Sequence, residues 1–262
     1  MTSGKQARRQ RQQAVARPPV RSTGGGRKAS PAVLIGALVA IVVIAAVAAV
    51  VLVTSNGGSS SSKTPTKLPD AGTIAKQFAG IPQSGDVLGK PGAAATLVEY
   101  IDLQCPVCRQ FETEVMPSII DRYVRTGKLK VIARPVTIIG PDSETGRRGM
   151  IAAFKQNRGF NFAQLLDFNQ GPENGGWLDD SMVASAAKSI PGVNVAALQA
   201  AANSSAAANQ AKTYDSQATR DGLTGTPTVL VGPSGGKLTP VAPGREPSAD
   251  ELKAAIDAAL AQ

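Results

Sequence analysis

Hydrophobic and polar positions divide the chain into segments with different patterns. Residues 32–53 form one apolar run of 22 residues without a charge. At 1.5 Å per residue, a helix of this length crosses roughly 30 Å of hydrocarbon, so the run predicts a transmembrane helix. Residues 1–31 before it are basic and contain Gly and Pro clusters, which is typical of a disordered segment. Residues 54–71 after it are rich in Gly, Ser and Pro and predict a flexible tether.

A strand, a helix and a second strand are predicted in the first part of the domain that spans residues 72–262. Thr96–Ile101 is a short β-prone run, and the stretch after it has apolar residues at helical intervals. These apolar residues are Val107, Phe111, Val115, Ile119 and Tyr123. Pro117 lies within that stretch and predicts a bend or break in the helix. Leu129–Ala133 is the next predicted strand, which completes a βαβ unit with a right-handed crossover.

Two strands and a helix are predicted at the end of the domain. Thr228–Val231 and Lys237–Val241 flank a Gly-rich turn and predict a β-hairpin. Ser248 and Glu251 have capping-box spacing at the start of the final helix, whose apolar residues again recur at helical intervals. The residues between the two halves, about 142–222, are mostly helical in pattern. They predict a helical insertion that lies over one face of the sheet, so the fold class is α/β.

Basic residues flank the predicted transmembrane helix on its N-terminal side. Eight Lys and Arg residues precede residue 32, and no acid occurs before Asp70. Because positive charge stays on the cytoplasmic side, the N-terminus is predicted to be cytoplasmic and residues 72–262 extracytoplasmic. A cleavable signal peptide is the alternative, but its apolar core is normally about 7 to 15 residues long. We therefore expect a single-pass protein of the cell membrane that contacts the lipid bilayer through residues 32–53.

The net charge of +9 does not by itself indicate a nucleic-acid-binding protein. Of the 28 basic residues, the 20 that follow the transmembrane run oppose all 19 acids, which leaves a net charge of +1 there. The basic excess lies before the membrane, where it sets the topology or attracts anionic lipid head groups. We expect no nucleic-acid partner.

The two cysteines of the chain, Cys105 and Cys108, form a Cys-Pro-Val-Cys motif, and the chain contains no histidine. Two thiols without an imidazole do not complete a tetrahedral zinc site or a Cys-His nucleophile. Thiol-disulfide exchange is the chemistry that remains, and it requires no metal or cofactor. The start of a helix stabilises a thiolate, so Cys105 is the predicted attacking sulfur and Cys108 the resolving one. Pro106 fits the first helical turn, where a missing N–H costs little.

Two segments carry a resemblance to a known family. Residues Glu99–Phe111, which contain the cysteine pair, resemble the active-site segment of DsbA-like oxidoreductases of the thioredoxin-fold superfamily. The segment Gly225–Thr228 resembles the cis-proline loop of the same family. The resemblance covers about residues 72–262 and implies a thioredoxin fold with βαβ and ββα halves around a helical insertion. It also implies a thiol:disulfide oxidoreductase.

The resemblance assigns roles to four further residues. Glu99 matches a buried acid that exchanges protons with the inner cysteine; the alternative is that Glu99 snorkels or pairs with a lysine. Thr226 and Pro227 match the loop that faces the disulfide and binds an extended substrate, with Pro227 in cis. Val107 departs from the best-known pattern, which has histidine there, and valine does not stabilise a thiolate as an imidazolium does. We therefore expect a milder oxidant than a Cys-Pro-His-Cys enzyme.

Three functions remain open at the level of sequence. The favoured one is an oxidase that forms disulfides in exported proteins and is reoxidised by a membrane-embedded redox partner. An extracytoplasmic reductase or isomerase is the first alternative, and a non-catalytic peptide-binding module is the second. No separate dimerisation domain lies between Pro69 and the predicted catalytic unit, which argues against a dimeric isomerase, and we expect a monomer. Substrates, redox partner and direction of electron flow are not encoded in any recognisable motif.

Overall fold

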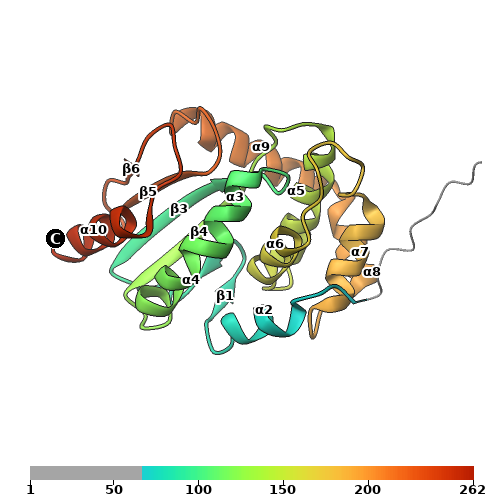
Figure 1. The fold of residues 1–262 in the computed structure, drawn as a ribbon, viewed down its shortest axis with the longest axis horizontal. Coiled ribbons are helices and arrows are strands. Elements are labelled where there is room, and N and C mark those ends of the chain that lie inside the picture. Colours follow the sequence, from blue (N-terminus) through green and yellow to red (C-terminus); the bar gives the residue numbers. More distant parts are fainter. Residues whose placement is uncertain (1–66) are drawn as a thin grey trace, which may run out of the picture. The chain divides into compact units, whose positions relative to one another are not determined.

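A six-stranded sheet with the order β1-β2-β4-β3-β5-β6 organises residues 67–262, the part of the chain that the computed structural model describes (Figure 1). Its strands are β1 (Gln83–Ser84), β2 (Val87–Leu88), β3 (Ala95–Ile101), β4 (Leu129–Pro135), β5 (Thr228–Pro233) and β6 (Thr239–Val241). β3 and β4 are parallel, whereas the other neighbouring strands are antiparallel. The predicted βαβ order and C-terminal hairpin are therefore confirmed, although β6 begins two residues later than expected.

Helices surround this sheet. The α-helices are α2 (Ala71–Gln77), α3 (Pro106–Gln110), α4 (Met116–Ile119), α5 (Pro141–Phe154), α6 (Gly159–Phe168), α7 (Asp180–Ser189), α8 (Val195–Ala202), α9 (Ser205–Arg220) and α10 (Ala249–Leu260). Two π-helical segments, η1 (Phe111–Val115) and η2 (Ile120–Val124), alternate with α3 and α4. The predicted capping box begins α10: the Ser248 hydroxyl accepts from the Glu251 N–H, and the Glu251 carboxylate accepts from the Ser248 N–H.

Pro117 does not end the helix that follows β3. The chain remains helical from Pro106 to Val124, with Pro117 in the first turn of α4. Proline removes one backbone donor and crowds the preceding turn of a regular α-helix. The wider π-helical turn η1 lies directly before α4, so the irregularity expected from Pro117 takes the form of a changed helical turn.

The two faces of the sheet pack against different side chains. Leu97 of β3 belongs to the main core together with Phe111 of η1. Tyr100, an odd number of residues further along β3, belongs to a smaller cluster with Ala218 of α9. Because successive strand residues point to opposite faces, α9 covers the face opposite to the one that carries η1.

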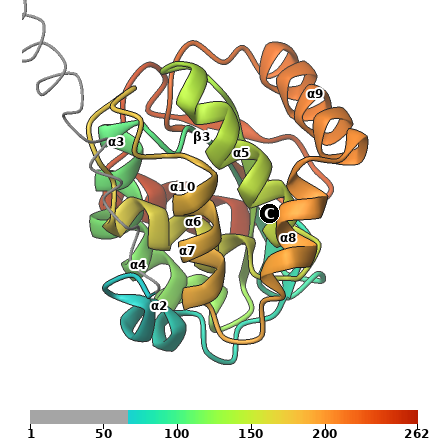
Figure 2. The same cartoon turned by 90° about the vertical axis from the view of Figure 1, so that its right-hand side faces the viewer.

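The insertion was predicted over one face of the sheet, and that prediction is wrong. α6 packs against α3 and η1 on the face of the main core, whereas α9 contacts β4 and covers the opposite face. Figure 2 shows the helices α5 to α9 gathered in front of the sheet, with α9 at the edge of the group. The buried residues of α9 are Ala207, Ala211, Tyr214 and Ala218. Ala218 belongs to the cluster on the opposite face, whereas the other three belong to the main core.

Two features near the start of the domain were not predicted. α2 and the β1-β2 hairpin precede β3, and β2 pairs with β4. Strands of two residues carry no readable period, which explains why the sequence did not indicate them. The last residues of the predicted tether also belong to the fold: Leu68 is buried, and its N–H donates to Ser189 Oγ at 2.7 Å.

No helix within residues 67–262 has both the length and the apolar composition needed to cross a membrane. The predicted transmembrane helix, residues 32–53, and the basic segment before it lie outside the described residues.

Candidate functional site

The two cysteines lie at the start of α3, directly after β3. Cys105 is the N-cap residue of this helix and has extended backbone angles, with φ −73° and ψ 118°. Its Sγ accepts a hydrogen bond from the N–H of Cys108 at 3.4 Å. Pro106 occupies the first helical turn, where its missing N–H costs no hydrogen bond within the helix. The thiols are free, so the structure represents the reduced pair.

The two sulfurs have different electrostatic surroundings. A hydrogen bond from the Cys108 thiol, assisted by Thr226 and by the N–H groups of Cys108 and Val107, lowers the pKa of Cys105 to about 6. Burial opposes this shift without reversing it. Burial, followed by the neighbouring Cys105, raises the pKa of Cys108 well above its usual value. Near neutral pH the reduced pair therefore carries its negative charge on Cys105 and its proton on Cys108.

The Thr226–Pro227 loop lies against Cys105. The peptide bond between these residues is cis, as the resemblance implies. The Cys105 thiol donates to the Thr226 carbonyl oxygen at 3.4 Å, and the thiolate form accepts from the Thr226 side chain. The loop reaches this place because β5 begins at Thr228 and pairs with β3, the strand that leads to the cysteines.

Glu99 lies in the middle of β3 with its side chain buried; 1% of its surface is exposed. Its Oε2 has no hydrogen-bond partner, and no Lys or Arg within residues 67–262 forms an ion pair with it. Burial, followed by the neighbouring Glu112 and then Asp167, raises the pKa of Glu99 well above its usual value. Glu99 is therefore an acid that retains its proton, which is the property that a proton donor to a cysteine requires.

Glu112 and Asp167 are buried acids that sequence reasoning missed. Glu112 follows Cys108 by four residues, a spacing that places both on one helix face and offered a usable signal. Asp167 is in α6, about 60 residues away, and has no local signal that links it to the cysteines.

Asp102 organises the backbone beside the cysteines. It is fully buried, and its Oδ1 accepts from the N–H of Gln104 at 2.9 Å. Its Oδ2 accepts from the N–H groups of Ile138 and Ile139, at 2.7 and 2.9 Å. Asp102 thus joins the active-site turn to the segment after β4, a role that needs partners remote in sequence.

The helical insertion also holds this turn. Gln170 follows α6, and its Nε2 donates to the carbonyl oxygens of Leu103 at 3.1 Å and Cys105 at 3.3 Å. Gln104 Nε2 donates to Ser143 Oγ of α5 at 2.9 Å. The backbone around the cysteines is therefore fixed by the insertion as well as by the sheet.

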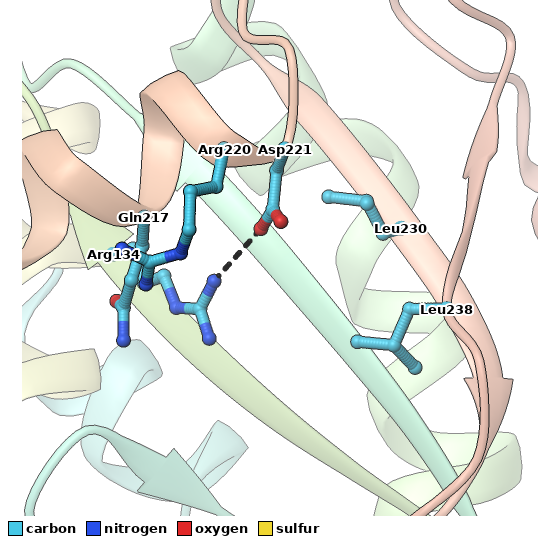
Figure 3. Close-up of a pocket in the computed structure, with 6 residues that line it drawn as sticks. All are labelled: Arg134, Gln217, Arg220, Asp221, Leu230 and Leu238. Atoms are coloured by element: carbon cyan, nitrogen blue, oxygen red, sulfur yellow. Dashed lines mark hydrogen bonds and ion pairs between the residues drawn. The ribbon is translucent and has the colours of Figure 1, made fainter.

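A polar network fixes the far end of the Thr226 loop. Tyr100 donates to Asp221 Oδ2 at 2.6 Å, and Arg134 Nη1 donates to the same oxygen at 3.1 Å. Asp221 follows α9 and begins the segment that leads to Thr226. Figure 3 shows the Arg134–Asp221 ion pair at a pocket in which Leu230 and Leu238 lie on the opposite side. None of the predicted site residues lines this pocket.

Three large apolar side chains are exposed within the described part of the chain: Val107, Ile138 and Phe168. Val107 lies between the cysteines, and Ile138 is bonded through its N–H to Asp102. Phe168 ends α6, two residues before Gln170, which binds the Cys105 carbonyl. All three therefore belong to segments that form or contact the active-site turn. Within residues 67–262, no group of Cys, Asp and Glu side chains is arranged to hold a metal ion.

Comparisons with known proteins agree with this architecture. A family model described as "Thioredoxin" matches residues 83–258. A probable disulfide bond formation protein D from Bacillus cereus is 27% identical over 176 residues, which cover 66% of this chain and 77% of that protein. The oxidised crystal structure of BdbD from Bacillus subtilis superposes with a TM-score of 0.60 at 22% identity, covering 69% of this chain and 97% of that one. For α-DsbA1 from Wolbachia pipientis, the TM-score is 0.58 at 21% identity, with 67% and 90% covered.

Proposed function

Because the chain belongs to the thioredoxin family and carries a complete cysteine pair, we propose that it forms disulfide bonds in exported proteins. It is a thiol:disulfide oxidoreductase with a DsbA-like thioredoxin fold and a helical insertion. We further propose that the protein acts as an oxidase outside the cytoplasm and is anchored in the membrane by residues 32–53.

The observation that carries the oxidase direction is the stabilised thiolate of Cys105, whose pKa is lowered to about 6. A protein that stabilises the reduced form of its cysteine pair makes the corresponding disulfide easier to reduce, and hence a better oxidant. Val107 contributes no charge to this stabilisation, so we expect the couple to be milder than one with histidine between the cysteines.

The proposed reaction begins with the disulfide form of the pair. A substrate thiolate attacks the Cys105 sulfur, a mixed disulfide forms, and the Cys105–Cys108 bond breaks with Cys108 as the leaving thiolate. Because the pKa of Cys108 is raised by burial, this thiolate takes up a proton, which we assign to Glu99 as donor. A second substrate thiolate then attacks the substrate sulfur of the mixed disulfide and releases Cys105 as a stable thiolate. The substrate gains one disulfide, and the pair gains two electrons.

Substrate binding is proposed at the surface around Cys105. The cis-Pro227 loop presents the Thr226 backbone beside the sulfur, where an extended substrate segment is able to pair with it. The exposed side chains of Val107, Ile138 and Phe168 offer apolar contacts of the kind that an unfolded exported protein provides. Reoxidation requires a partner that accepts two electrons, and we propose a membrane-embedded redox protein within reach of the tether.

The reductase or isomerase alternative differs in the resting state of the pair. The test is to trap thiols in growing cells that express the full-length chain and to measure the oxidation state of Cys105 and Cys108. The oxidase proposal predicts a mostly oxidised pair, and a mostly reduced pair supports the reductase alternative. The peptide-binding alternative predicts that Cys105→Ser leaves oxidation of a reduced model peptide unchanged.

A further inference from the structure

Three buried carboxyl groups from distant parts of the sequence interact with one another near the cysteine pair. They are Glu99 of β3, Glu112 of η1 and Asp167 of α6, with 1%, 9% and 1% of their surfaces exposed. Glu99 and Glu112 influence each other's pKa, and Asp167 interacts electrostatically with both. Each group retains one buried oxygen without a partner: Glu99 Oε2, Glu112 Oε1 and Asp167 Oδ2.

The carboxyl cluster does not hold three negative charges in this environment. Burial is the largest cause that raises the pKa of each member, and no cation is buried among them within residues 67–262. The charged groups that act on Asp167 are Glu112, Glu99, the Cys105 sulfur and the exposed Arg109 of α3. Helices α2, α5 and α7 also contact α6.

The position of Asp167 near the end of α6 also favours its protonated form. Asp167 is the penultimate residue of this helix, where the partial negative charge of the backbone carbonyls disfavours a carboxylate. A buried acid at that place is costly unless it is protonated. Asp167 therefore holds a proton for reasons of burial and helix geometry together.

Gln164 fixes α6 against the helix that carries Cys108. Its side chain is 1% exposed, and its Nε2 donates to the Glu112 carbonyl oxygen at 3.0 Å. Its Oε1 is buried without a partner, three residues before Asp167 on the same face of α6. This oxygen is an acceptor available to the O–H of a protonated carboxyl group.

We infer that Asp167 is a positioning residue of the redox site. It shares its proton with Glu112 and Glu99, so that the carboxyl cluster stays protonated and able to donate a proton to Cys108. The inference rests on the proposed exchange reaction and extends it to the helical insertion. When the disulfide is attacked, Cys108 leaves as a thiolate and a cluster carboxyl gives it one proton. The resulting carboxylate is shared among the three acids. On reoxidation Cys105 first forms a mixed disulfide with the disulfide of the redox partner. The Cys108 thiol then returns its proton to that carboxylate and attacks the Cys105 sulfur, which reforms the pair's disulfide and releases the partner as a thiolate.

The test is the pH dependence of the rate at which the oxidised full-length chain oxidises a dithiol peptide. At high pH the carboxyl cluster loses its last proton and no longer donates to Cys108, so the rate of peptide oxidation falls. This fall is the alkaline limb of the profile. Asp167→Asn removes one proton and one like charge, so the remaining acids lose their last proton at lower pH. We expect the alkaline limb to move toward acid by on the order of one pH unit, the size typical of carboxyls that titrate as a group.

Matched variants separate this effect from general damage. Asp167→Glu retains a carboxyl and should restore the alkaline limb, and Glu112→Gln should move it in the same direction as Asp167→Asn. Asp180→Asn changes an exposed acid of α7 in the same insertion and should leave the profile unchanged. An Asp167→Asn profile that coincides with that of the unmodified chain overturns the inference.

A second measurement needs no variant. Oxidised-minus-reduced infrared spectra of the unmodified chain, with carbon-13 only in aspartic acid carboxyls, should show a labelled protonated-carboxyl band that changes with redox state. Absence of that band overturns the inference even if Asp167→Asn fails to fold. If the unmodified chain and Asp180→Asn show no Cys105-dependent oxidation of the peptide, the proposed function itself fails, which is a separate result.

Discussion

The surroundings of Cys105 and those of Cys108 are opposite in character, although three residues separate the two sulfurs. Cys105 lies at the N-cap of α3, accepts from the Cys108 N–H and faces the Thr226 loop. Cys108 lies one turn inside, 1% exposed, on the same side of the helix as Glu112. Donors surround the first sulfur, whereas the second is enclosed in the protein interior, where burial raises its pKa.

This contrast assigns different tasks to two chemically identical thiols. The chain contains no histidine, so no imidazolium helps to hold a thiolate. Position at the end of a helix and hydrogen bonds from neighbouring groups perform that task for Cys105. The surroundings of Cys105 therefore stabilise a thiolate, whereas those of Cys108 favour a protonated thiol.

The largest expected effect comes from removal of each sulfur in turn. Cys105→Ser should reduce oxidation of a dithiol peptide to the uncatalysed rate, because the attacked sulfur is lost. Cys108→Ser should also abolish oxidation of the dithiol peptide, because no disulfide can form in the pair. Given the peptide in its disulfide form, its Cys105 thiolate should attack and accumulate a mixed disulfide that no second cysteine resolves. Mass spectrometry under non-reducing conditions detects the adduct. Equal loss in both variants, with no adduct in either, would remove the distinction between outer and inner sulfur.

Glu99→Gln tests the inner side and should slow peptide oxidation about tenfold near neutral pH, less than a lone general acid contributes because Glu112 and Asp167 remain. The stability effect has a defined sign. The pKa of Glu99 is raised in the folded state, so its contribution to stability is present below its unfolded pKa and lost as pH rises. Glu99→Gln should therefore unfold at higher denaturant concentration than the unmodified chain at pH 8, with a smaller difference at pH 4.

Glu173→Gln is the matched control for Glu99→Gln, because Glu173 is exposed in the loop after α6. It should change neither the rate nor the denaturation midpoint. An unchanged pH profile of exchange in Glu99→Gln would sink the proton-donor assignment.

Val107→His changes the charge beside the Cys105 thiolate. Position 107 is 42% exposed, so an imidazole placed there is solvated and able to become charged beside Cys105. We expect the reduction potential of the pair to rise by about 30 mV or more, which corresponds to about a tenfold change in the exchange equilibrium. Equilibration with glutathione measures the change, and Val107→Ala serves as the uncharged control. A potential that stays constant in Val107→His would show that charge at this position has no effect on the thiolate.

Asp221→Asn should have the smallest effect, because it changes only the anchor of the Thr226 loop. Loss of the ion pair with Arg134 and of one charge-assisted bond from Tyr100 should lower the free energy of unfolding by about 1 kcal/mol. The KM for the peptide should rise more than kcat falls, since the proposed substrate contact is with Thr226. Asp250→Asn, which breaks an exposed pair with Lys253, is the control and should be nearly neutral. A change in kcat alone would argue against loop positioning.

The elements that were predictable from sequence are those with a sustained period or a local signal. β3, the helix after it, β4 and the C-terminal hairpin follow from alternation, helical spacing and turn residues, and α10 follows from its capping box. The hairpin of β1 and β2 has two-residue strands and offers no period. The placement of α9 on the far face depends on tertiary packing, which a helical pattern alone does not specify.

The residues of the site also differ in whether they were predictable from the sequence. Cys105, Cys108 and Pro227 belong to short motifs, and the structure places all three together. Asp167 reaches the carboxyl cluster only because α6 folds back onto η1. Nothing near Asp167 in the sequence encodes that contact.

The direct test of the contrast between the two sulfurs is a titration of thiolate absorbance in the reduced full-length chain. One thiol should ionise with a pKa of about 6 and the other well above the ordinary range for cysteine. The low transition should persist in Cys108→Ser, shifted upward because its hydrogen bond from the Cys108 thiol is lost, and should be absent in Cys105→Ser. Two thiols that both ionise near the ordinary value for free cysteine, about 8.5, would contradict the account.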